Sequence, residues 1–251
     1  MDTRMRLGRV LKHAMIASLF VSTLAAIEPV HAAPTVVAEL FSSQGCSSCP
    51  PADRLLSELA EDEAVLPLTL AVDYWDYLGW KDTLASAAHS DRQRAYANRR
   101  GDRSVYTPQI VVNGVEHVVG SREGEVNGAM DRADAFTARV DLTSNKMAVK
   151  ATVDGALPDG AQMATVLFLR ISRQETVEIA RGENAGRTVT YTNVVRSIQP
   201  IGMWTGGKAT FHMPKSELMK SEGDSCAVLI QLEHQDGPGA IVGANLLAWR
   251  E

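Results

Sequence analysis

A Cys-x-x-Cys motif stands where a predicted strand gives way to a predicted helix, and few folds place two thiols at such a junction. Residues 34–41 form an apolar, β-branched run that predicts a strand, and residues 42–45 form a tight polar loop. Cys46 and Cys49 follow, separated by two serines. A helix is predicted over 49–61, because three leucines share one face and prolines are tolerated in a first turn. The sequence therefore places two thiols at the N-terminus of a helix.

A second stretch, about sixty residues later, predicts the other half of a site. Thr107-Pro108 enters a short β-branched strand that ends in an Asn-Gly turn, and a partner strand follows over 115–119. Asn-Gly between such runs is a strong hairpin signal. An X-Pro bond adopts the cis form at small cost, and a cis Pro108 beside the thiols would expose the backbone of Thr107 to an extended substrate. The alternative is a trans proline on an edge strand.

The order of predicted elements indicates an α/β first domain. Parallel strands joined by a crossover helix, followed by a hairpin, make a mixed sheet with helices on both faces. The strands are expected at 34–41, 65–72, 107–112 and 115–119, and the helices at 49–61, 83–100 and 123–136.

After residue 138 helical periodicity is nearly absent. Short strand-like runs alternate with Gly, Pro, Asp and Asn, which is typical of an all-β, sandwich-like domain. The runs expected there are 140–142, 148–153, 164–171, 176–180, 188–198, 209–212, 226–233 and 241–249. The predicted organisation is therefore a first domain over 33–138 and a β-rich domain over 139–251.

The first 32 residues have the pattern of a secretory signal peptide. Four basic residues precede a short apolar run over 14–26, and small residues precede a plausible cleavage point near Ala33. An uncleaved anchor is the alternative, although the run is shorter than the roughly 20 residues that a membrane span needs. The mature protein is expected in the periplasm or outside the cell, with no membrane contact after cleavage.

Charge and cysteine usage narrow the function classes. The net charge is −5 and no Lys/Arg-rich stripe stands out, which argues against nucleic acid as a partner. Three cysteines are too few for a disulfide-stapled scaffold, and a Cys-x-x-Cys pair closes too small a loop to stabilise the fold much. Cys226 opens a predicted strand over 226–232 and is expected to be a small buried hydrophobe.

The paired cysteines suit thiol–disulfide exchange. The attacking species is a thiolate, and a helix N-terminus favours negative charge, so we expect Cys46 to be the nucleophile and Cys49 the resolving thiol. Glu39 lies on the preceding strand. It would relay a proton if its side chain lay under Cys49, and it would otherwise be a solvated or cross-paired carboxylate. The aromatic loop over 73–80 either shapes a substrate groove or packs to hold the sheet.

At these residues the chain resembles the thioredoxin-like superfamily. More closely, it resembles a family of exported bacterial thioredoxin-like proteins of unknown function. The matching stretches are 39–53, 72–80, Arg92-Gln93-Arg94 with Tyr96, 105–109, 182–187 and 193–196.

The resemblance implies a thioredoxin-like first domain and a β-rich second one. It also implies that Cys46 is the nucleophile, Cys49 the resolving cysteine and Pro108 a cis-proline. The chain departs from thioredoxin in its Ser-Ser dipeptide, in Gly45 where a tryptophan would stand, and in the position of Glu39. These differences leave open whether it oxidises, reduces or isomerises disulfides.

The sequence therefore predicts an exported thiol–disulfide oxidoreductase. It would act on protein or peptide thiols and disulfides with an unknown redox partner, and without a cofactor or metal. One alternative is a non-catalytic binding module, with residues 182–187 as a recognition loop or simply a turn with solvated charges. The other is a copper carrier, for which Cys-x-x-Cys supplies two soft ligands. His117 is the one further candidate ligand, and we expect it to be an exposed strand residue.

Overall fold

The computed structural model describes residues 33–218 and 223–248, so the predicted signal peptide lies outside the described residues. The helices are α1 (Pro50–Leu59), α2 (Ala87–Arg100), α3 (Glu123–Asp131) and α4 (Lys215–Leu218), with a 3-10 turn η1 (Asp76–Leu78). The strands are β1 (Val36–Ser42), β2 (Val65–Ala71), β3 (Gln109–Val112), β4 (Glu116–Val119), β5 (Ala138–Ser144), β6 (Ala148–Gly155), β7 (Ala164–Ile179), β8 (Arg187–Trp204), β9 (Ala209–Pro214), β10 (Ser225–His234) and β11 (Gly237–Ala248). No helix in this part of the chain is long and apolar enough to cross a membrane.

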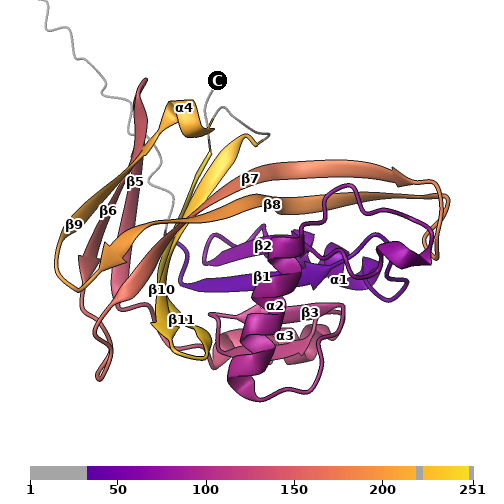
Figure 1. Ribbon diagram of the computed structural model, residues 1–251, viewed down its shortest axis with the longest axis horizontal. Coiled ribbons are helices and arrows are strands. Elements are labelled where there is room, and N and C mark those ends of the chain that lie inside the picture. The colour runs from indigo at the N-terminus through magenta and orange to yellow at the C-terminus, as the bar shows by residue number, and fades with distance from the viewer. Residues whose placement is uncertain (1–32, 219–222, 249–251) are drawn as a thin grey trace, which may run out of the picture. The chain divides into compact units, whose positions relative to one another are not determined.

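The protein is a mixed α/β structure with one large mixed sheet and few helices (Figure 1). Eight strands follow the order β11-β10-β7-β8-β2-β1-β3-β4. β1 pairs with β2 in parallel, as strands joined by the crossover helix α1 do, and with β3 antiparallel; β3 and β4 form the predicted hairpin. β2 and β8 meet at the single bridge Thr69–Val194, so strands from both sides of residue 138 share this sheet.

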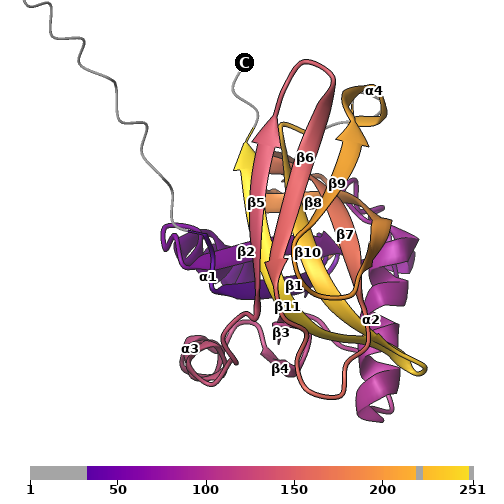
Figure 2. The ribbon, with the colours of Figure 1, turned by 90° about the vertical axis from the view of Figure 1, so that its left-hand side faces the viewer.

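Alternation along β1 sends its side chains to two different helical layers. Ala38 and Leu40 pack with α1 and α3, whereas Phe41 packs edge-on against Tyr96 of α2. Figure 2 shows α2 and α3 on opposite sides of the strands. Both faces of β1 are therefore buried, which explains why residues 36–41 are nearly continuous in apolar character.

Helix α2 begins at Ala87 rather than at the predicted residue 83. Asp82 accepts a hydrogen bond from Leu84 N–H, which holds a turn there, and Ser86 then caps the helix by accepting from Ala88 N–H. These local side-chain bonds to the backbone set the start of α2, and hydrophobic periodicity does not reveal them. Helix α3 ends at Asp131, before the predicted residue 136.

Strands β7 and β8 are single long strands, whereas the sequence predicted shorter runs in both places. They pair with each other over almost their full length and extend beyond the other strands as a two-stranded arm (Figure 1). The inner half of β7 is buried and its outer half is mostly exposed, so the apolar signal fades before the strand ends. Residues 180–186 form the tip of this arm.

A second, three-stranded sheet has the order β5-β6-β9 (Figure 2). Its inner face shares a hydrophobic cluster with the large sheet, in which Val140 and Val153 lie with Phe168, Trp204 and Val228. The two sheets therefore bury a common core among the residues that follow position 138.

Candidate functional site

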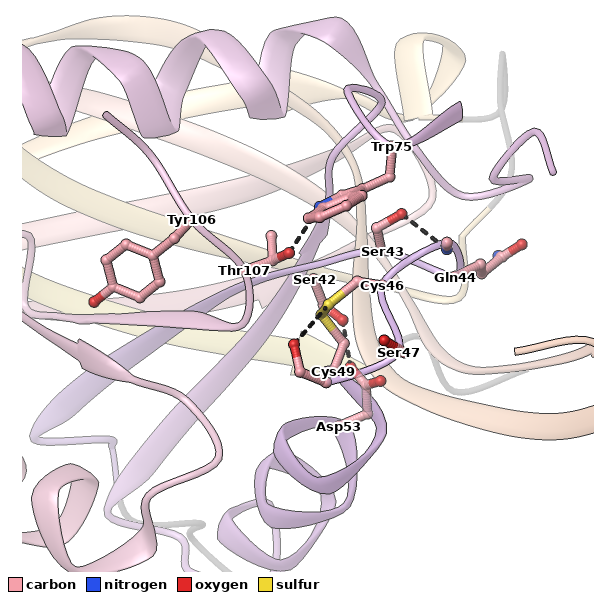
Figure 3. Close-up of a disulfide and its surroundings, with 12 residues drawn as sticks. Ser42, Ser43, Gln44, Cys46, Ser47, Cys49, Asp53, Trp75, Tyr106 and Thr107 are labelled. Atoms are coloured by element: carbon pink, nitrogen blue, oxygen red, sulfur yellow. Dashed lines mark hydrogen bonds between the residues drawn. A yellow bond between two sulfur atoms is a disulfide. The ribbon is translucent and has the colours of Figure 1, made fainter. Parts of the chain in front are cut away.

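Cys46 and Cys49 form a disulfide at the start of α1 (Figure 3). Their sulfurs are 2.19 Å apart and their Cα atoms 5.4 Å apart. Cys49 is the residue that precedes the helix, and Pro50 and Pro51 occupy its first turn. Backbone N–H groups there have no partner within the helix, and proline has no N–H to leave unpaired. The predicted placement of the pair at a strand-to-helix junction is confirmed.

Both sulfur-bearing residues are buried, but the dipeptide between them is not. Cys46 and Cys49 are 2% and 0% exposed, whereas Ser47 and Ser48 are on the surface. Hydrogen bonds from Cys46 N–H to Ser43 O (3.1 Å) and from Cys49 N–H to Cys46 O (3.2 Å) wind this segment tightly. A partner would therefore meet the disulfide from the side of the two serines.

The Thr107-Pro108 segment is brought to the same end of the sheet. The Thr107–Pro108 peptide bond is cis. Gln109, the next residue, pairs with Phe41 near the end of β1, and the cysteine loop begins directly beyond that end. Two segments about sixty residues apart in sequence thus lie around one site (Figure 3).

Trp75, from the aromatic loop, lies close to both segments (Figure 3). Its indole Nε1–H donates a 2.8 Å hydrogen bond to Thr107 Oγ1. A Cβ atom on Gly45 would lie 3.1 Å from Trp75 Cβ, so glycine leaves room for the tryptophan against the cysteine loop. This aromatic side chain packs in the site and holds the Thr107 segment in place.

Asp53 is a site residue that the sequence analysis did not single out. It lies one helical turn beyond Cys49, on the same side of α1, and is 4% exposed. Ser42 Oγ–H donates a 2.7 Å hydrogen bond to its carboxylate beside the disulfide (Figure 3). Burial raises the pKa of Asp53 from 3.8 to about 7, and the nearby charge of Asp82 adds to this effect. The i, i+4 spacing from Cys49 is the signal that could have found it.

Glu39 occupies a different place from the one that its proton-relay interpretation requires. It shares a face of β1 with Phe41, which is the α2 side, whereas Cys49 belongs to α1 on the other face. Arg92 Nε–H donates to Glu39 at 2.7 Å and Tyr96 Oη–H at 2.6 Å. The structure therefore makes Glu39 the buried partner of an arginine and does not bring it to the cysteine pair.

The tip of the β7–β8 arm is part of the site. Asn184 is 1% exposed, and its Nδ2 donates hydrogen bonds to Gln44 O at 2.9 Å and to Cys46 O at 2.8 Å. Ser47 N–H donates to Glu183 at 3.3 Å. Residues 182–187 are therefore neither a free recognition loop nor a turn with only solvated charges, because two of their side chains contact the cysteine loop.

A third contact fixes the cysteine loop from the side of the aromatic segment. Gln44 N–H donates to the buried carboxylate of Asp82 at 2.8 Å, and Trp80 Nε1–H donates to Gln44 Oε1 at 2.7 Å. Burial raises the pKa of Asp82. The cysteine loop is thus held from two sides, by the tip of the β7–β8 arm and by the segment that carries Trp80 and Asp82.

The remaining sequence candidates lie elsewhere. His117 is half-buried rather than exposed, and it hydrogen-bonds Tyr106 Oη and Gln109 Nε2; burial lowers its pKa. Cys226 is fully buried, and burial raises the pKa of its thiol to about 12, which confirms its predicted role as a small hydrophobe. Within residues 33–218 and 223–248, no three His, Cys, Asp or Glu side chains group as metal ligands.

The fold and the site together define a mixed α/β protein with a disulfide between a central strand and its following helix. The chain belongs to a family described as "Protein of unknown function (DUF1223)", whose model matches residues 37–231. None of the curated proteins compared matches it.

Two solved structures are similar to this chain. The first is a crystal structure of a protein from Agrobacterium tumefaciens, 34% identical, with a TM-score of 0.78; the match covers 88% of this chain and 96% of that one. The second is HBP35 of Porphyromonas gingivalis, 13% identical, with a TM-score of 0.59; the match covers 86% of this chain and 75% of that one. The second likeness concerns the fold alone.

Proposed function

We propose that the protein is an exported thiol–disulfide oxidoreductase whose residues 33–138 form a thioredoxin-like unit and residues 139–251 a β-rich one. The observation that carries this proposal is the pairing of a Cys46–Cys49 disulfide with Asp53, a buried carboxyl of pKa about 7 one turn along the same helix. Disulfide exchange needs a group that accepts and returns a proton near neutral pH, and such a pKa suits that task.

In the reducing direction the Cys46 thiolate attacks one sulfur of a substrate disulfide. That bond breaks, a mixed disulfide forms, and the first substrate thiolate leaves. Asp53 accepts the proton of the Cys49 thiol, and the Cys49 thiolate then attacks the Cys46 sulfur. The second substrate thiolate leaves and the Cys46–Cys49 disulfide is restored. The oxidising direction follows the same steps in reverse.

The surrounding residues have positioning roles in this proposal. Trp75 donates a hydrogen bond to Thr107 and so fixes the residue that precedes the cis Pro108. Asn184 and Asp82 fix the loop that carries Cys46. Glu39 is left out of the proton transfer.

Export is supported by two features. Disulfides persist in oxidising compartments, and the Cys46–Cys49 bond is formed. The basic and apolar pattern of residues 1–32 is that of a signal peptide, although it lies outside the described residues. The substrates we propose are protein or peptide thiols and disulfides, with an unidentified redox partner.

The test is turnover of a protein disulfide, such as that of insulin, with dithiothreitol as reductant. We expect wild type to accelerate reduction and Cys46→Ser to abolish the acceleration. Cys49→Ser should accumulate a mixed disulfide on Cys46, visible by mass spectrometry. Cys226→Ser is the matched control, because that thiol is buried elsewhere. Equal rates in wild type and Cys46→Ser would end the proposal.

A further inference from the structure

A groove runs along α1 on the side of the β7–β8 arm. Its volume is about 570 Å³. Asp53, Arg54 and Ser57 line it from the helix, and Thr188, Val189 and Thr190 from β8. At one end the groove is lined by Pro50, the residue that directly follows Cys49 in the chain. Ser57 and Thr192 hydrogen-bond at 2.7 Å on the side toward the helix C-terminus.

One wall of the groove is a strand edge with free backbone groups. In an antiparallel pair, alternate residues direct their N–H and C=O groups away from the partner strand. Thr192 is such a residue, because its carbonyl accepts a 2.7 Å hydrogen bond from Thr69 Oγ1 of β2. The register with β7 is continuous from Thr192 to Arg187, so Thr190 and Thr188 point the same way.

The edge at these two threonines has no strand beside it. Within the described parts of the chain, β8 meets its other neighbour, β2, only at Thr69–Val194. Thr188 and Thr190 are exposed, and their backbone groups face the groove rather than β7. An unpaired edge of this kind is a template for an added strand.

We propose that this groove binds an extended segment of the substrate polypeptide, which adds as a strand to the free edge of β8. The proposal rests on the proposed function and names where its substrate lies. The occupant is argued from the hydrogen-bonding groups at Thr188 and Thr190, which an extended chain satisfies. The position of the groove also indicates that the bound segment contains a cysteine, because a strand that passes Pro50 brings its own cysteine to Cys46.

The groove also bears on the proton transfer that is proposed for Asp53. Asp53 lines it, so the groove offers water a route to the buried carboxyl. A bound strand covers that route while exchange proceeds. Arg54 and Glu58 on the α1 rim and Arg187 on β8 present both signs of charge, which favours a substrate segment chosen by backbone shape over one chosen by net charge.

The test tethers a probe peptide to Cys46 in the Cys49→Ser variant. The probe alternates threonine and valine around a central cysteine, and it is activated as a mixed disulfide with thionitrobenzoate. Hydrogen exchange of the Thr188 and Thr190 amides is then compared with the same protein carrying cysteine alone. We expect exchange to slow by about tenfold or more at both amides. The amide of Val189, already paired with β7, should not change.

Unchanged exchange, or protection confined to the Thr107 segment, would overturn the groove as the binding site. A second variant, Thr190→Pro, removes an N–H that β7 does not use, and Thr190→Val retains it. Loss of one hydrogen bond should slow reduction of the peptide disulfide about fivefold in the proline variant alone. Reduction of a small disulfide should be equal in both. Equal peptide rates would count against the groove.

The same experiments separate this inference from the proposed function. Normal turnover without protection of the β8 edge would support the oxidoreductase activity and rule out the groove as the substrate-binding site. Protection of the edge without turnover by wild type would rule out the oxidoreductase activity and support a groove that binds peptides.

Discussion

Replacing Asp53 by asparagine should change how stability depends on pH. The carboxyl is neutral in both the folded and the unfolded chain below pH 3.8, so its burial costs little there. Between pH 3.8 and about 7 the unfolded chain ionises first, and the folded state loses stability as pH rises. Above that range the loss is constant. Asparagine keeps an acceptor for Ser42 Oγ–H but has no charge to bury.

The magnitude follows from the two pKa values. A pKa raised from 3.8 to about 7 corresponds to about 4 kcal/mol, at 1.36 kcal/mol for each pKa unit. The free energy of unfolding of Asp53→Asn minus that of wild type should therefore rise by up to about 4 kcal/mol between pH 4 and pH 8. Guanidinium unfolding of the oxidised proteins at several pH values measures this difference.

The matched control is Asp91→Asn, which changes an exposed aspartate of α2. Its difference from wild type should stay nearly flat over the same range. A flat difference for Asp53→Asn as well would refute the argument that burial keeps this carboxyl protonated. The reaction gives a second readout, because the resolving step of wild type should rise with an apparent pKa near 7 and that of the variant should lose this dependence.

Three further variants test the packing around the site. Asn184→Ala should lower the free energy of unfolding by about 2 kcal/mol, because the carbonyls of Gln44 and Cys46 lose their hydrogen-bond donor; chemical denaturation measures this change. Arg92→Met should cost about 3 kcal/mol or more, since Glu39 would remain buried without its cation, and the double variant with Glu39→Gln should recover part of this loss. Gly114→Ala should cost about 2 kcal/mol, because its φ is +71° and the new Cβ would lie 2.5 Å from a backbone carbonyl; thermal unfolding measures the change.

Each of these variants has a control that the chain itself supplies. Ala185→Ser changes the exposed neighbour of Asn184 and should leave stability unaltered. Arg94→Met removes an exposed arginine of α2 and should cost little. Gly124→Ala lies in α3 with nothing within 4 Å of the new Cβ, so it should be neutral or slightly stabilising. A loss at Gly124 equal to that at Gly114 would contradict the steric argument.

Several elements were predictable because their signals are local. The β-branched run before Cys46, the prolines after Cys49 and the Asn113-Gly114 turn each act through neighbouring residues, and each predicted element is present. Asn113 shows how such a signal works: its φ is 45°, which asparagine tolerates, and Gly114 follows at +71°. The order of strands and helices in the first half follows from the same local patterns.

The length of β7 and β8 was not predictable in this way. Their outer halves are mostly exposed, so no apolar alternation marks them, and each is held by pairing with the other. The position of the arm's tip depends on Asn184 reaching Gln44 and Cys46, about 140 residues away in sequence. No local pattern carries information about a contact of that separation.

The chain alone therefore determined the cysteine pair, its place at a helix start and the proline segment that follows, because these depend on residue type and short spacing. Tertiary structure alone decided which carboxyl stands behind Cys49. Glu39 and Asp53 are both acidic residues near the motif, but the pleat of β1 directs the first to α2 and the helical repeat holds the second beside the disulfide. Both carboxyls are buried, and what separates them is their partners, Arg92 for Glu39 and Ser42 for Asp53, which lie beside them only after distant segments pack together.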